Sequence, residues 1–100
     1  MSADNIMKIH ALTGVLNSYT DRLNQVQTKC VECDTMIVAL DAIIVETMIE
    51  PDSSEKLEKI DKLNVDKNKH CLRKNKFDCK IVRLNSIINT INSNITALSP

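Results

Sequence analysis

The chain has 100 residues, of which 43% are hydrophobic, and its 13 basic side chains balance its 13 acidic ones. Gly14, Pro51 and Pro100 are the only glycine and proline residues. Three such residues cannot provide the many turns of a β-sandwich or the glycine-rich loops of an α/β fold. Residues 1–50 carry a net charge of −4 and residues 51–100 one of +4. The halves therefore attract each other, or copies of each other, which argues against nucleic acid or an acidic membrane as main partner.

Apolar side chains recur through residues 3–50 at alternating steps of three and four, as they do along one face of a helix. Eleven of the twelve positions in this row are apolar or cysteine. The row consists of Ile9, Leu12, Leu16, Tyr19, Leu23, Val26, Cys30, Cys33, Ile37, Leu40, Ile44 and Thr47. This spacing predicts a helix over about residues 3–50 with a coiled-coil seam. A β-strand over residues 36–49, which are rich in Ile and Val, is the alternative, but no second strand-like segment exists to pair with it.

Pro51 marks the one strong interruption of the helical pattern. Proline disfavours the helical conformation of the residue before it, so the first helix should end near Glu50. Asp52, Ser53 or Ser54 can cap the next helix, and Asp52 with Glu55 fits a capping box. The sequence therefore predicts a turn at residues 50–54 and a second helix over about residues 53–98.

The second helix repeats the seam with a polar centre. Its apolar positions are Ile60, Leu63, Phe77, Ile81, Leu84, Ile88, Ile91, Ile95 and Leu98. Between them the seam positions are Lys67, His70 and Lys74. Buried polar residues at such positions fix the register of coiled coils, so we expect this centre to set the pairing at a cost in stability.

Folding the chain back at the turn places residues opposite each other when their numbers add up to about 104. This register brings Ile9 to Ile95 and Ile44 to Ile60, with further pairs Leu16–Ile88, Leu23–Ile81 and Leu40–Leu63, and it sets Asp34 opposite His70. Two seams read independently agree on one register. The fold class predicted is all-α, a single domain over residues 1–100 formed by a long antiparallel helical hairpin.

Apolar residues also occur outside the seam, where the hairpin itself cannot cover them. They are Val31, Met36, Val38, Ile43, Val45, Ile49, Val65 and Leu72, with Cys79 continuing the spacing of the last two. Exposed apolar area of this size favours association or aggregation. We therefore predict that these residues form a partner interface, in a larger helical bundle with copies of the chain or with other subunits.

Cys30 and Cys33 form a Cys-x-x-Cys pair within the first predicted helix. The register places them level with His70 and Cys71, so these four residues are candidate zinc ligands. A Cys33–Cys71 disulfide is a further possibility, disfavoured by a reducing compartment. The pair lacks the helix N-terminus that activates thiols in oxidoreductases. We expect structural thiols with no metal and no cofactor, and a redox- or zinc-responsive regulator is the alternative.

Residues 67–83 carry seven basic side chains and one acid, Asp78, which suggests a nucleic-acid-binding helix pair as a second alternative. We instead expect a solvated face whose charge is neutralised by the first helix. Catalysis has little support, because no Ser-His-Asp or Cys-His set and no pair of carboxylates converges. The main hypothesis is a non-enzymatic coiled-coil subunit of a larger assembly.

Residues 1–10 lack the pattern of a secretory signal. No apolar run reaches the ~18 residues of a membrane span. We therefore expect an intracellular protein, cytoplasmic or nuclear, or a virion-associated one if its source is viral.

Overall fold

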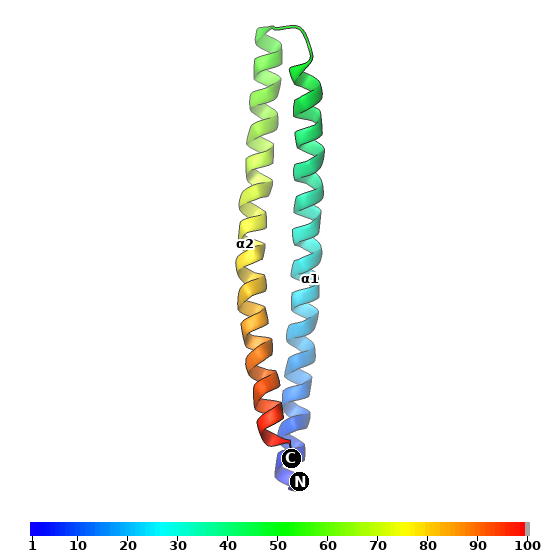
Figure 1. Cartoon of the computed structure of the whole chain (residues 1–100), viewed down its shortest axis with the longest axis vertical. Coiled ribbons are helices and arrows are strands. Elements are labelled where there is room, and N and C mark those ends of the chain that lie inside the picture. The colour runs from blue at the N-terminus through cyan, green and yellow to red at the C-terminus, as the bar shows by residue number, and fades with distance from the viewer. Residues whose placement is uncertain (100) are drawn as a thin grey trace. The chain divides into compact units, whose positions relative to one another are not determined.

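The computed structural model describes residues 1–99 as two α-helices, α1 (Ala3–Met48) and α2 (Ser54–Leu98), joined by a short turn (Figure 1). No strand occurs in this part of the chain. The all-α prediction is confirmed, and the alternative of a β-strand over residues 36–49 is wrong because those residues up to Met48 continue α1. Neither helix has a stretch apolar enough to cross a lipid bilayer within the residues described.

Contacts divide the chain into two compact units, each pairing a segment of α1 with a segment of α2. We call Thr28–Asp78 the turn unit, and Met1–Gln27 with Cys79–Pro100 the terminal unit. In both units the row of residues predicted as the seam is shielded from solvent while the positions around it are mostly exposed. The prediction of a single domain stays a prediction.

The turn unit is an antiparallel helical hairpin. Its most shielded side chains are Cys30, Cys33, Leu40 and Thr47, which are buried. Half-buried seam positions surround them: Ile37, Ile44, Ile60, Leu63, Phe77 and the polar Lys67, His70 and Lys74. The hydroxyl of Thr47 donates a hydrogen bond to the carbonyl of Ile43 at 2.7 Å, so this buried polar group is satisfied within its own helix.

In the terminal unit, Leu84 and Ile91 of α2 are buried. The other predicted seam residues of this unit are half-buried: Ile9, Leu12, Leu16, Tyr19, Leu23 and Val26 on α1, and Ile81, Ile88, Ile95 and Leu98 on α2. The Asn5 side-chain amide donates to the carbonyl of Leu98 at 3.5 Å, which ties the start of α1 to the end of α2. The pairing in this unit is therefore antiparallel as well.

The turn differs in detail from the one predicted. α1 ends at Met48, two residues early, because the backbone N–H groups of Ile49 and Glu50 bond to carbonyls only three residues back. α2 begins at Ser54 because Ser53 is its N-cap: the Ser53 hydroxyl accepts the backbone N–H of Lys56 at 3.1 Å. The capping box assigned to Asp52 and Glu55 is therefore wrong.

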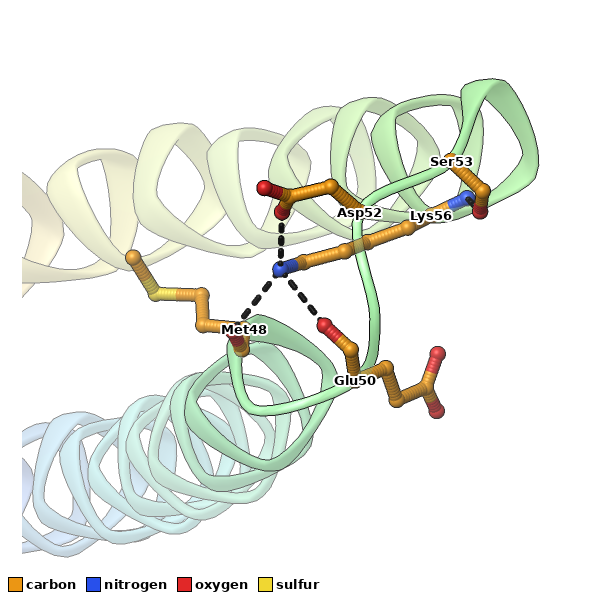
Figure 2. A network of polar contacts seen from close by, with 5 residues as sticks. All are labelled: Met48, Glu50, Asp52, Ser53 and Lys56. Carbon is orange, nitrogen blue, oxygen red and sulfur yellow. Dashed lines mark hydrogen bonds and ion pairs between the residues drawn. The ribbon is translucent and has the colours of Figure 1, made fainter.

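Lys56 closes the turn (Figure 2). Its Nζ donates to the carbonyls of Met48 and Glu50, both at 2.8 Å, and pairs with the Asp52 carboxylate at 3.0 Å. The side chain is only 11% exposed. Lys56 lies four residues before Ile60 and therefore occupies the preceding position of the α2 seam. The seam spacing thus directs its side chain toward the end of α1. One lysine thus satisfies two carbonyls that the end of α1 and the turn leave without helical partners.

Replacing Lys56 with Met should lower the free energy of unfolding by about 1–2 kcal/mol, because hydrogen bonds from a shielded ammonium group are among the stronger ones. Lys59→Met is the matched control. Lys59 bonds only to the Glu50 carboxylate, at 3.3 Å, and is half exposed, so its loss should cost about 0.5 kcal/mol or less. Urea unfolding followed by circular dichroism compares the two, and equal losses would contradict the role given to Lys56.

Candidate functional site

Two ion pairs join the helices in the polar centre of the turn unit. Lys74 Nζ lies 2.7 Å from Asp34 Oδ1, and Lys67 Nζ lies 2.7 Å from Asp41 Oδ1. Both lysines occupy seam positions but carry their ammonium groups out to aspartates at the edge of the seam. The hydrogen bond to Asp34 raises the pKa of Lys74, and the bond to Asp41 raises that of Lys67. The lysines therefore stay charged, and their methylene chains cover the seam.

These contacts fit the predicted register, although the paired numbers add up to more than 104. Cα–Cβ bonds tilt toward the N-terminus of a helix. Lys74 therefore reaches back about one turn along α2 to the level of His70, which the register sets opposite Asp34. Lys67 likewise reaches the level of Leu63, opposite Leu40 and its neighbour Asp41. Each pair thus locks the same alignment of α1 and α2 in this unit.

Cys30 is buried, and its Sγ donates a hydrogen bond to Asp78 Oδ1 at 3.2 Å. This bond raises the pKa of the Cys30 thiol, and burial and the negative charges of Asp78 and Asp34 act in the same direction. Reactive cysteines need the reverse, a stabilised thiolate. The environment of Cys30 therefore favours a structural thiol over a redox centre.

The four candidate zinc ligands do not assemble into a site. Cys33 is buried, while His70 and Cys71 are half-buried. Within residues 1–99 no group of three or more His, Cys, Asp or Glu side chains is placed to hold a metal ion. All four cysteines are free, so the Cys33–Cys71 disulfide is not formed. Cys30 meets Asp78, which lies about two turns further along α2 than His70 and Cys71, so Cys30 is not level with these two candidate ligands.

His70 carries a buried ring nitrogen, Nδ1, for which no hydrogen-bond partner exists in the part of the chain that the structure describes. A buried polar atom without a partner costs about 1–3 kcal/mol. The ring lies at a seam position between Lys67 and Lys74. The polar centre is therefore a weak part of the hairpin interface, held in register by its two ion pairs.

Replacing His70 with Leu should raise the free energy of unfolding by about 1–2 kcal/mol, because an apolar side chain removes the orphaned nitrogen and fills the seam. His10→Leu is the control: His10 is exposed, so the change should stay within about 0.5 kcal/mol. Chemical denaturation at neutral pH measures both. A His70→Leu variant less stable than the wild type would show that the ring makes a bond in solution.

The pKa directions predict a loss of stability at alkaline pH. A raised pKa in the folded state means that this state holds the proton longer than the unfolded chain. The stabilisation is complete below the unfolded pKa, about 8.5 for Cys and 10.4 for Lys, and is lost as the pH rises through the folded values of Cys30, Lys67 and Lys74. The free energy of unfolding, measured at a series of alkaline pH values, should fall in two stages. The stage at lower pH should be smaller in Cys30→Ala, and the stage at higher pH should be smaller in the double variant Lys67→Met with Lys74→Met. Profiles that match the wild type would contradict the assignment.

All eight residues predicted to form the partner interface lie in the turn unit and are 40–80% exposed. α1 contributes Val31, Met36, Val38, Ile43 and Val45, and α2 contributes Val65 and Leu72. Ile49 directly follows the last residue of α1, Met48. The turn unit thus presents apolar side chains on both helices, away from the seam. Leu57 and Met48, near the turn, are also exposed and were not included in the prediction.

The sequence matches no protein-family model, and no curated protein or solved structure is significantly similar to it.

Proposed function

We propose that this protein is a non-catalytic coiled-coil subunit that packs through the turn unit on helices of other chains. The observation that carries the proposal is the set of eight apolar side chains at 40–80% exposure within one unit. Isolated apolar residues on a surface need no explanation, but exposed apolar residues that recur at helical spacing on both helices of one unit mark interaction surfaces. Partner helices laid along α1 and along α2, on the sides away from the seam, would remove these residues from water, as helices do in bundles.

The polar centre supports this proposal over the two alternatives. The carboxylate beside Cys30 opposes thiolate formation, which a redox-responsive regulator would need. Among the basic residues of the 67–83 stretch, Lys67 and Lys74 are already bound to aspartates of α1. Their charge is therefore neutralised within the hairpin, which weakens the case for binding a phosphate backbone.

The native mass of the chain tests the proposal. Sedimentation of the purified protein, and native mass measurement of a tagged chain isolated from its source cells, should show the chain in an assembly in at least one case. A chain that is monomeric, stable and soluble in both would contradict the proposed function. Far-UV circular dichroism of the same samples should confirm that the helices persist.

A further inference from the structure

The turn unit carries a second helical row on α1, away from the seam. Val31, Val38 and Val45 are 59–68% exposed and Ile49 is 80% exposed. With Thr35 and Ala42, both exposed, they follow the same alternating steps of four and three as the seam. Positions at this offset lie about 150° around the helix from the seam. We call these six residues the outer stripe of α1; its spacing is that of a second coiled-coil interface.

α2 carries a corresponding row. Val65 and Leu72 are 54% and 64% exposed. Asn68 and Asn75, also exposed, continue the row at the same alternating steps. We call these four residues the outer stripe of α2. Asparagine within an apolar row is a device that specifies register and partner in coiled coils.

Charged residues of opposite sign flank the two stripes. On α1 the flanking positions on one side hold Glu32 and Glu46, both exposed. On α2 the equivalent positions hold Lys62, Lys69 and Lys76, also exposed. Lys62 makes only a surface pair with Glu58 of its own helix, at 3.5 Å. An apolar helix face with acidic flanks fits best against one with basic flanks, and this chain presents both.

The other side of the α1 stripe is already engaged. It is flanked by Asp34 and Asp41, which are bound to Lys74 and Lys67 of the same chain. A partner helix would therefore be guided by Glu32 and Glu46. In an antiparallel arrangement these two face Lys76 and Lys62 while Val38 meets Leu72 and Val45 meets Val65. A parallel arrangement would instead direct the lysines at the two aspartates, which are already paired.

From this match we propose that the occupant of the surface is a second copy of the chain. The outer stripe of α1 in one copy packs antiparallel on the outer stripe of α2 in the next. The inference rests on the proposed function and specifies its partner. The two patches that meet are different, so the contact is heterologous: each added copy leaves one stripe of each kind open, and the assembly grows beyond a dimer or closes into a ring.

A charge exchange tests the pairing. Glu32→Lys with Glu46→Lys makes the guiding charges of α1 basic like those of α2, and Lys62→Glu with Lys76→Glu makes the two α2 charges that face Glu32 and Glu46 acidic like them. Each variant alone should associate at least about tenfold more weakly than the wild type, since like charges then face each other. An equimolar mixture should recover the assembly, because every contact between the two variants pairs opposite charges again. Sedimentation velocity over a wide concentration range measures all three samples.

The matched control is Asp4→Lys with Asp21→Lys, which changes the net charge as much as the first variant does. Both aspartates are exposed and belong to the terminal unit, outside the proposed contact, so this variant should assemble like the wild type. Four outcomes would each overturn self-association through these stripes. They are a wild type that is monomeric, a charge variant that assembles fully by itself, a mixture of the two variants that does not assemble, and a control variant that dissociates. A wild type that is monomeric alone but assembled with other proteins in its source would overturn this inference and leave the proposed function standing.

Crosslinking provides a second measurement if a charge variant loses helicity. On a background with the four cysteines replaced by Ser, chains carrying Val38→Cys are mixed with chains carrying Leu72→Cys and oxidised. Mixed disulfide dimers should dominate over dimers of either chain with itself. An excess of disulfides that join position 38 of two chains would indicate that α1 packs on α1. An absence of disulfides would show that the stripes do not meet. Both outcomes overturn the proposal.

Discussion

Replacing Leu40 with Ala should lower the free energy of unfolding by about 2–4 kcal/mol, the cost of truncating a buried leucine and leaving a cavity. Leu40 is buried in the turn unit at a position where the seams of α1 and α2 meet. A chain of this size has a total stability of only about 5–15 kcal/mol, so the loss should shift the midpoint of urea unfolding clearly.

Val38→Ala is the matched control, since it truncates an apolar side chain in the same stretch of α1. Val38 is 68% exposed, so under dilute conditions its truncation should change the unfolding free energy by about 0.5 kcal/mol or less. Comparable losses for the two variants would show that the seam does not bury Leu40 in solution. Ile91→Ala extends the measurement to the terminal unit, where Ile91 is buried on α2.

The seam could be predicted from the sequence because one periodic signal determines it. A step of three or four residues selects one face of a helix whatever the side chain, so the row through Lys67, His70 and Lys74 was placed as reliably as its apolar parts. These three are half-buried in the structure, as their spacing implies. Periodicity therefore predicted both helices and the face that each one buries.

The turn and the ion pairs could not be predicted in the same way, because they depend on where individual side chains reach. Ser53 rather than Asp52 caps α2, a choice among neighbouring polar residues that the spacing leaves open. Asp34 and Asp41 are seven residues apart, as are their partners Lys67 and Lys74. This equal spacing is a signal that could have found both pairs. The bond from Cys30 to Asp78 follows the same alignment, since its residue numbers add up to 108 as those of both ion pairs do. It could still not be predicted from the sequence, because a thiol and a carboxylate carry no opposite charges that would mark them as partners.

The variant Val38→Asp with Val45→Asp should abolish association of the chain while leaving its helices formed. The two valines are 68% and 59% exposed on α1, so charge there does not enter the seam. Burying an unpaired carboxylate against an apolar partner surface costs several kcal/mol. This exceeds what two exposed valines contribute to a contact, at roughly 25 cal/mol per Å² of apolar area removed from water. Sedimentation should therefore report a monomer at concentrations where the wild type assembles.

Met7→Asp with Val15→Asp controls for charge and for the lower helix propensity of Asp. These side chains are 71% and 45% exposed and belong to the terminal unit, outside the predicted interface. The control should assemble like the wild type, and both double variants should keep the wild-type circular dichroism spectrum. If the control also dissociates, general repulsion rather than the turn unit governs association. If the Val38 and Val45 variant still assembles, the contact uses other residues and the outer stripe of α1 is not its surface.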